Sequence, residues 1–345
     1  MLRQRTAAAD RDTTESSDVR LLLRAEAVWW MMRPNFYMPA VATLATWLAT
    51  SQQPLQWQSG VLAALGVALL SGGMQIANDV FDQRADRITA PHLPLPAGLL
   101  SPLHGRVLAL AALALAACFI ALSSPGDLFA SLGVLLGVAL LGTLYSRAKR
   151  WTFLATLLAS LAYAALCILG WIAGGKVTSA TLYVYVFDVW GVAFYGNTLA
   201  SIRDIDLDLH AGNDTPATRY GPRKAITLAL LPWVASFAVT LFWATANHVG
   251  SLGVSLLLLP ALVAPPTIAR AVRRLEKGPT GRSARAAQLN PLFLLNFGRQ
   301  VALVALAAPE LGWVLILLLL ALHRISTRAY QRRIVEGRLA MALGA

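Results

Sequence analysis

Residues 153–173 read FLATLLASLAYAALCILGWIA, a stretch of 21 residues without a charged side chain. A helix of this length is about 30 Å long, which is enough to cross the hydrocarbon core of a bilayer. Backbone polar groups in contact with lipid must satisfy one another, so such a stretch predicts a helix. Because similar stretches recur along the whole chain, they decide the class of fold.

Nine apolar runs have the length of a membrane span, and a shorter tenth run follows them. They cover 27–50, 57–81, 103–122, 128–145, 153–173, 180–202, 225–246, 250–268, 289–308 and 311–322. We therefore expect an all-α integral membrane protein with nine transmembrane helices and a short tenth. A polar leader (1–26), which does not resemble a cleavable signal peptide, would precede the membrane domain (27–323), and a basic tail (324–345) would follow it.

The composition excludes other classes of protein. Hydrophobic residues make up 57% of the chain and charged residues 13%, with a mean hydropathy of +0.59. A soluble domain has about 25% charged residues. The cysteines Cys118 and Cys167 both lie within apolar runs, so we expect them to be packing residues rather than a disulfide or a zinc site.

Basic residues give the expected orientation. The net charge is +12, and 27 of the 29 Lys and Arg residues fall on one side of the membrane if the tenth run spans. Lys176 is on the other side, and Arg299 lies within the ninth run. The positive-inside rule explains this asymmetry, whereas binding to nucleic acid does not. We expect a multi-pass protein of the plasma membrane whose basic side faces the cytosol.

The first of two acidic segments follows the second apolar run. It reads NDVFDQRAD from Asn78 to Asp86, with carboxylates at Asp79, Asp82 and Asp86. In a continuing helix these three positions fall within an arc of about 60°. Like charges at this spacing repel one another, so a compensating cation is expected.

The second acidic segment follows the sixth apolar run. It reads RDIDLD from Arg203 to Asp208, in which Asp204 and Asp208 are i, i+4 neighbours and Asp206 points elsewhere. Only 17 residues of the chain are acidic, yet six of them fall in these two segments, both at the cytosolic ends of even-numbered spans. Two solvated acidic loops are the alternative interpretation.

Clustered carboxylates beside a membrane favour Mg²⁺. This ion prefers oxygen ligands and often combines one or two carboxylates with water and substrate phosphates. The two segments could therefore hold two or more ions at one opening, with a diphosphate between them.

These motifs resemble the UbiA-type intramembrane prenyltransferase superfamily. The residues from Asn78 to Asp86 match its first motif, Asn-Asp-x-x-Asp-x-x-x-Asp, and Asp204 with Asp208 match its second, Asp-x-x-x-Asp. The second motif, with Thr215, Arg219 and Gly221 after it, is most similar to the menaquinone-pathway branch. Arg33-Pro34, Tyr145-Ser146 and Lys149-Arg150 also look familial.

The resemblance covers roughly residues 27–270 and implies fold, activity and site. It implies a ring of nine helices around a lipid-open cavity, in which a prenyl group moves from an isoprenoid diphosphate to a hydrophobic acceptor in the bilayer. The acceptor would be an aromatic compound, a quinone precursor or a lipid. The implied metal ligands are Asp79, Asp82, Asp86, Asp204 and Asp208, of which all but Asp86 are also the catalytic set. The implied substrate contacts are Asn78, Tyr145, Lys149, Arg150 and Arg203.

The chain departs from the family in one loop. Many relatives have an Asn after the first motif and then Arg-Pro-Leu-Pro-x-Gly, whereas Thr89 and Leu93 stand here at the Asn and Arg positions. Contacts that this loop makes in relatives are therefore in doubt, and Arg84, Arg87 or His92 are candidate substitutes. For Lys149, Arg150 and Arg203, a role as positive-inside anchors is the alternative.

Residues within the spans suggest two further features. An allylic cation would be protected by an apolar cavity and attracted by aromatic faces; the candidates, which are equally typical of packing, are Tyr145, Tyr163, Trp190, Phe194 and Tyr195. Asp188 lies about 24 Å before Asp204 along a helix. Because carboxylates inside a membrane need a partner, we expect a structural ion pair with Arg299, although a polar contact in the cavity is an alternative.

Three functions are compatible with these features. The first is Mg²⁺-dependent prenyl transfer. The second is an intramembrane terpene cyclase, in which the cation attacks its own double bonds without an acceptor; the changes at Thr89 and Leu93 favour it slightly. The third is a transporter or channel, which is disfavoured because transport sites normally lie near mid-bilayer.

Overall fold

The computed structural model describes residues 24–33, 37–51, 55–89, 93–148, 151–177 and 179–309, together with positions 314, 317, 318, 320–322, 324 and 325. These residues form helices and connections without a β-strand, as expected. Half of the predicted tenth run, most of the leader and most of the tail lie outside the described residues.

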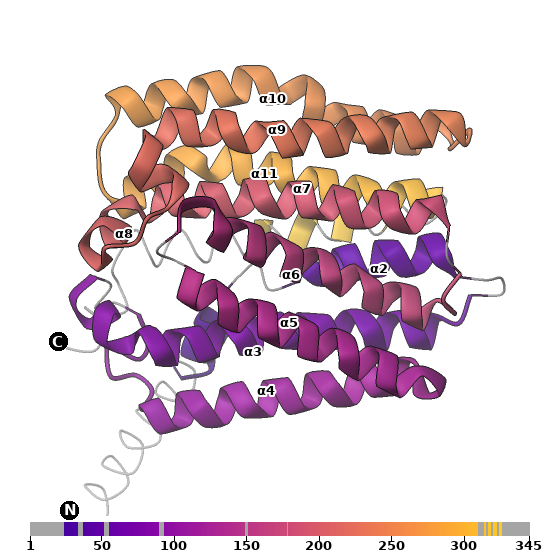
Figure 1. Ribbon diagram of the computed structural model, residues 1–345, viewed down its shortest axis with the longest axis horizontal. Coiled ribbons are helices and arrows are strands. Elements are labelled where there is room, and N and C mark those ends of the chain that lie inside the picture. The colour runs from indigo at the N-terminus through magenta and orange to yellow at the C-terminus, as the bar shows by residue number, and fades with distance from the viewer. Residues whose placement is uncertain are drawn as a thin grey trace, which may run out of the picture.

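Nine helices of 13 residues or more occur in the described part, together with a short helix, α8, and a 3₁₀ turn, η1 (Figure 1). Their bounds are α2 Met38–Thr50, α3 Trp57–Thr89, α4 Pro102–Ser123, η1 Pro125–Asp127, α5 Leu128–Ala148, α6 Thr152–Ala173, α7 Ala180–Arg203, α8 Ile205–Ala211, α9 Pro216–Ala246, α10 Ser251–Lys277 and α11 Arg282–Ala307. Residues 24–31 are also helical.

Seven of these helices are long and apolar enough to cross a membrane: α3, α4, α5, α6, α9, α10 and α11. The other two differ from the expected spans. α2 has only 13 residues, and α7 has 24 residues but carries Asp188 and several polar side chains. The seven helices make this a multi-pass membrane protein, as predicted.

The first apolar run is not one helix, which corrects the predicted span over 27–50. The helical segment 24–31 ends before Arg33, whose φ is 64°, and α2 begins at Met38. Pro34 explains the break, because proline disfavours the α conformation of the residue before it. The break places Arg33 between two helical segments, where its side chain can turn toward α3.

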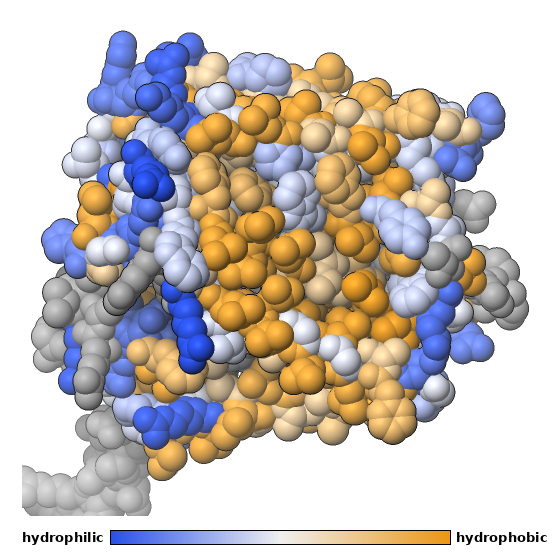
Figure 2. Space-filling view, in the orientation of Figure 1, coloured by the Kyte–Doolittle hydropathy of each residue, from blue (hydrophilic) through white to orange (hydrophobic). Residues whose placement is uncertain are grey.

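The long helices lie side by side, and α7 is central among them (Figure 1). α7 packs against α2, α6, α9 and α11, and α11 also packs against α2, so the last long helix returns to the first. Large apolar side chains on α4, α5 and α10 face outward, including Leu110, Phe129 and Leu262. They contribute to an apolar band between two hydrophilic ends (Figure 2). This surface is what contact with lipid requires.

Two glycines allow α7 and α6 to pack closely on their neighbours. A Cβ atom at Gly191 of α7 would lie 2.1 Å from the Ser236 hydroxyl of α9, and one at Gly170 of α6 would lie 2.2 Å from the Thr43 carbonyl of α2. Small residues at such crossings let helix backbones approach in a membrane. Close approach of α7 to α9 brings Asp188 within reach of polar groups on α9.

The predicted ion pair between Asp188 and Arg299 is confirmed. Arg299 of α11 donates from Nη2 and Nε to Asp188 Oδ2 of α7, and both side chains are fully buried. Thr240 of α9 also donates to this oxygen, at 2.6 Å. The Arg299 guanidinium lies 4.8 Å from the ring centroid of Trp233. The pair therefore joins α7, α9 and α11 within the apolar band.

The two cysteines differ from one another. Cys167 of α6 is fully buried, as expected of a packing residue, whereas Cys118 of α4 is exposed. The expectation that Cys118 packs inside the protein was therefore wrong, because α4 turns that face outward.

Candidate active site at one end of the bundle

The first acidic segment lies on the last three turns of α3. Asp79 is buried, with 3% of its surface exposed, and Arg33 Nη2 donates to its Oδ1 at 2.6 Å. The other carboxylate oxygen, Oδ2, is buried and accepts no hydrogen bond from the residues that the structure describes. Asp79 therefore presents one oxygen that an added cation could use.

Asp82 and Asp86 lie on the same side of α3 as Asp79. Both exert electrostatic repulsion on the Asp79 carboxylate, as their helical spacing predicts. Asn78 Nδ2 donates to Asp82 Oδ2 at 3.0 Å, so an amide steadies the second carboxylate of the segment. The three carboxylates share one helix face.

The second acidic segment spans the junction between α7 and α8. α7 ends at Arg203, and the Asp208 N–H donates to the Asp204 carbonyl at 3.0 Å, which preserves a helical turn through the junction. α8 ends at Ala211 and is capped by Gly212, whose φ of 67° suits glycine. Asn213 follows and donates from Nδ2 to Asp208 Oδ1 at 3.1 Å.

Two arginines hold the Asp204 carboxylate. Arg203 donates to Oδ1 at 3.0 Å and to Oδ2 at 2.6 Å, and Arg282 Nε donates to Oδ1 at 2.7 Å. Burial by itself raises the pKa of Asp204, but the two guanidinium groups outweigh burial and lower it to about 2. Asp204 is therefore ionised at neutral pH.

Asp206 points away from Asp204, as expected, and pairs with Arg285, one turn after Arg282 on α11. Neither Arg282 nor Arg285 was predicted as a site residue. Both were counted only among the basic residues that set orientation. Nothing in their local sequence separates them from their basic neighbours; only the packing of α11 beside α7 and α8 does so.

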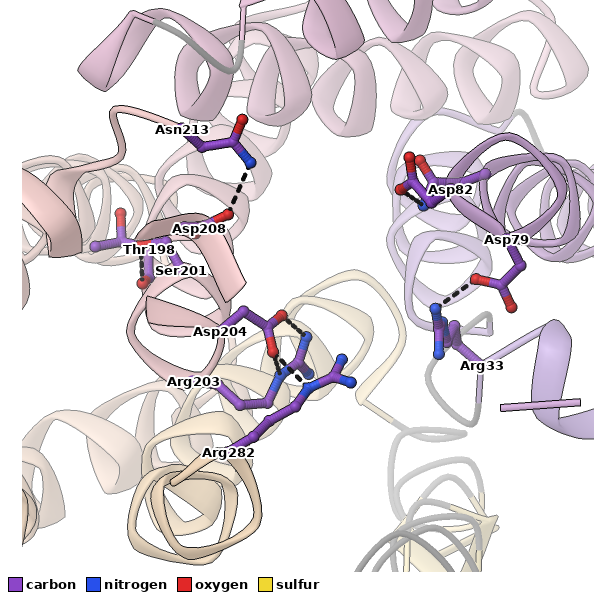
Figure 3. A network of polar contacts seen from close by, with 11 residues as sticks. Arg33, Asp79, Asp82, Thr198, Ser201, Arg203, Asp204, Asp208, Asn213 and Arg282 are labelled. Carbon is purple, nitrogen blue, oxygen red and sulfur yellow. Dashed lines mark hydrogen bonds and ion pairs between the residues drawn. The ribbon is translucent and has the colours of Figure 1, made fainter. Parts of the chain in front are cut away.

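The two acidic segments face one another across an opening (Figure 3). α3 carries Asp79 and Asp82 on one side, and the α7–α8 junction carries Asp204 and Asp208 on the other. Arg282 attracts the Asp79 carboxylate electrostatically while it is bonded to Asp204. The opening therefore combines carboxylates from distant parts of the chain with guanidinium groups from three further positions: Arg33, Arg203 and Arg282.

The described residues do not form a metal cage by themselves. Among them, no three His, Cys, Asp or Glu side chains lie close enough together to hold an ion. Mg²⁺ does not need such a cage, because it often takes one or two carboxylates and completes its shell with water and substrate phosphates. The unpartnered Oδ2 of Asp79 fits this kind of ligand set.

Several other predicted residues either lie outside the described part of the chain or are partly or fully buried. Lys149 and Arg150 lie outside the described residues, and so does His92, while the side chains of Arg84 and Thr89 are not described. Tyr145 is on the last turns of α5 and is partly buried. Leu93 is buried, with 6% of its surface exposed, so it packs inside the protein.

The loop after α8 is tied to the start of α6. Thr152 Oγ1 donates to Asp214 Oδ2 at 2.6 Å and accepts from Arg219 Nη1 at 2.7 Å. Thr215 and Thr218 form a reciprocal capping box at the start of α9. These contacts fix both ends of the short segment that carries Asn213, and they involve Thr215 and Arg219 of the matched motif.

Three of the aromatic candidates, Trp190, Phe194 and Tyr195, lie on α7 and divide between two of its faces. Trp190 and Phe194 have ring centroids 5.9 Å apart, and the series continues to Phe153 of α6, at 6.3 Å from Phe194. Tyr195 instead faces Trp233 of α9, at 6.0 Å. Trp190 and Phe194 are thus part of an aromatic cluster between α6 and α7, whereas Tyr195 packs against Trp233 of α9.

Comparisons with known proteins agree with this architecture. The UbiA prenyltransferase family model matches residues 38–298. Protoheme IX farnesyltransferase of Alkalilimnicola ehrlichii is 31% identical over 247 residues, covering 65% of this chain and 79% of that protein. Digeranylgeranylglyceryl phosphate synthase of Saccharolobus solfataricus is 32% identical over 77 residues, which cover 22% of this chain and 27% of that one.

Solved structures share the fold. A UbiA homologue of Aeropyrum pernix K1 has a TM-score of 0.64 at 22% identity, covering 82% of this chain and 98% of that one. A UbiA homologue of Archaeoglobus fulgidus bound to GPP and Mg²⁺ has a TM-score of 0.55 at 17% identity, covering 81% and 99%.

Proposed function

We propose that this chain, which belongs to the UbiA prenyltransferase family and is therefore a transferase of prenyl groups, uses Mg²⁺ to move a prenyl group from an isoprenoid diphosphate to a hydrophobic acceptor in the membrane. The acceptor would be aromatic, a quinone precursor or a lipid. The observation that carries the proposal is the meeting of two acidic segments, 125 residues apart from Asp79 to Asp204, at one opening.

Each group at the opening has a role in this proposal. Asp79, Asp82, Asp86, Asp204 and Asp208 would hold Mg²⁺, which when bound supplies positive charge against the departing diphosphate. Asn78 keeps Asp82 in place, as its hydrogen bond indicates. Arg203 would face the diphosphate, with Lys149, Arg150 and Tyr145 as further substrate contacts. Arg33, which reaches Asp79 from the break before α2, adds a cation on the α3 side.

Prenyl transfer requires positive charge near the diphosphate and a site from which water is excluded. An allylic carbon–oxygen bond breaks readily only if negative charge on the diphosphate is stabilised as it forms. The resulting carbocation must then react with the acceptor before it reacts with water. We expect a ring of helices with a lipid-open cavity below the aspartates to exclude water, and the aromatic faces of Trp190 and Phe194 to line part of it.

The relatives support transfer to an acceptor over cyclisation. Their names, protoheme IX farnesyltransferase and digeranylgeranylglyceryl phosphate synthase, describe enzymes that prenylate another molecule. A homologue with the same fold binds GPP with Mg²⁺. In this chain we place the active site at the cytosolic face of the plasma membrane, because the positive-inside rule assigns that face to the basic end.

The deciding experiment is turnover of the detergent-solubilised protein. Farnesyl or geranylgeranyl diphosphate with Mg²⁺ is incubated with and without a panel of aromatic, quinone-precursor and lipid acceptors. We expect diphosphate release that requires both Mg²⁺ and an acceptor, and a prenylated product by mass spectrometry. A cyclic hydrocarbon or alcohol formed without acceptor would instead establish the cyclase, and no release under any condition would refute both.

A further inference from the structure

We propose that Arg282 is a diphosphate-binding residue that exchanges its bond to Asp204 for the substrate. This inference rests on the proposed function, because it assigns a role within the same site. Because Arg282 holds Asp204 until the substrate arrives, the second acidic segment would bind metal only together with diphosphate. Its evidence is the position of one arginine between two acidic segments.

Arg282 reaches the opening from the far end of the sequence. It begins α11, its Nε lies 2.7 Å from Asp204 Oδ1, and its side chain is 19% exposed. It also attracts Asp79 electrostatically, across the opening. A diphosphate placed between the two segments would therefore lie beside this guanidinium.

Asp204 has more cationic partners than one carboxylate requires. Arg203 alone engages both of its oxygens, and Arg282 adds a second guanidinium on Oδ1. One carboxylate thus faces two positive charges. A divalent cation that approaches Asp204 without an anion meets repulsion from both, so its binding there is unfavourable until an arginine turns away or a polyanion arrives.

Arg282 is the better suited of the two arginines to turn. Arg203 precedes Asp204 directly in the chain, so its side chain starts beside the carboxylate, whereas Arg282 only meets Asp204 through tertiary packing. One turn later, Arg285 pairs with Asp206 and is nearly buried. That pair can hold the start of α11 beside α8 while the Arg282 head group moves.

The chemistry of guanidinium favours diphosphate as the new partner. Its planar fork of donors matches phosphate oxygens and forms charge-assisted hydrogen bonds that are about twice as strong as neutral ones. An isoprenoid diphosphate also carries more negative charge than one carboxylate. Transfer of Arg282 to the diphosphate then leaves Asp204 with Arg203 and with room for a metal ligand bond.

This role predicts two effects of opposite sign in Arg282→Gln. Loss of the guanidinium should tighten binding of Mn²⁺ alone several-fold, because one competing cation is gone. It should weaken Mn²⁺-dependent binding of geranyl thiolodiphosphate, a probe that resists cleavage, by roughly 10- to 100-fold. A residue that only props up the fold would weaken both.

The experiment measures Mn²⁺ binding by electron paramagnetic resonance and probe binding by calorimetry on the full-length protein in detergent. Arg282→Lys keeps the charge without the fork and should lose less probe affinity than Arg282→Gln. Arg223→Gln is the matched control, because Arg223 is an exposed arginine of α9 that pairs with Glu276 at 3.4 Å. Thermal melting of each variant checks folding.

The outcomes separate the inference from the proposed function. Opposite shifts in Arg282→Gln, with no change in Arg223→Gln, support the role of Arg282. If the wild type binds the probe but Arg282→Gln shifts neither binding or weakens both, the inference is wrong and the proposed function stands. If the wild type shows no Mn²⁺-dependent binding of any prenyl thiolodiphosphate, the proposed function fails with it.

Discussion

Asp79 lies on the last three turns of α3 and Asp204 directly follows α7, and their carboxylates are held differently. Asp79 has one oxygen bonded to Arg33 and the other without a hydrogen bond in the described structure. Asp204 has both oxygens bonded, to arginines from α7 and α11. Under the proposed function, the first segment can accept a cation directly, whereas the second becomes a metal ligand only when an arginine is displaced.

The largest effect on activity is expected when the charge of Asp79 or of Asp204 is removed. Asp79→Asn and Asp204→Asn should each lower kcat/KM by roughly 10³-fold or more, because each removes charge next to the developing diphosphate. Binding of Mn²⁺ then distinguishes them. Asp79→Asn should weaken it without diphosphate, whereas Asp204→Asn should weaken it only when diphosphate is present. Equal losses in both conditions would remove the contrast between the two segments.

The ion pair of Asp188 and Arg299 is a third arrangement for comparison, because both side chains are fully buried and we expect them to stay paired when substrate binds. Asp188→Asn should destabilise the protein by about 3 kcal/mol, because it leaves an arginine without a charged partner in the core. Chemical unfolding in detergent micelles measures this loss. A double variant, Asp188→Asn with Arg299→Gln, should recover part of it. Activity per folded molecule should change much less, and a loss as large as that of Asp79→Asn would contradict a purely structural pair.

The smallest expected effect concerns the amide in each segment. Asn78 donates to Asp82, and Asn213 donates to Asp208, at 3.0 and 3.1 Å. Asn78→Ala and Asn213→Ala should each lower kcat/KM about fivefold, which corresponds to one hydrogen bond of about 1 kcal/mol. Steady-state kinetics at saturating Mg²⁺ measures it. An unchanged kcat/KM in either variant would show that its aspartate does not need the amide.

Much of the fold and part of the site followed from local patterns. Runs without charge predicted helices, and α3 continues through Asp79, Asp82 and Asp86, which is the helix that their predicted spacing on one face requires. The pairing of Asp188 with Arg299 also followed, because a buried charge inside a membrane needs an opposite charge. These features depend either on residues that are close together in the chain or on the need of a buried charge for an opposite charge, which few residues in the spans can supply.

Three other features could not be predicted from local patterns in the sequence. The break at Arg33 was missed because hydropathy counts apolar residues and gives Pro34 little weight. Leu93 was judged by its place in a loop motif, although it is buried. Arg282 was missed as a partner of Asp204, because a basic residue at the end of a span has the same sequence signal whether it anchors the helix or reaches an active site.

Hydrophobic length and periodicity, which act over a few turns of helix, were thus enough to establish a membrane bundle with two acidic segments. The tertiary structure alone decided that these segments share one opening and that α11 delivers Arg282 between them. Coulomb interactions depend on distance in space, and the packing of α11 against α2 and α7 sets that distance through contacts between segments that lie far apart in the sequence.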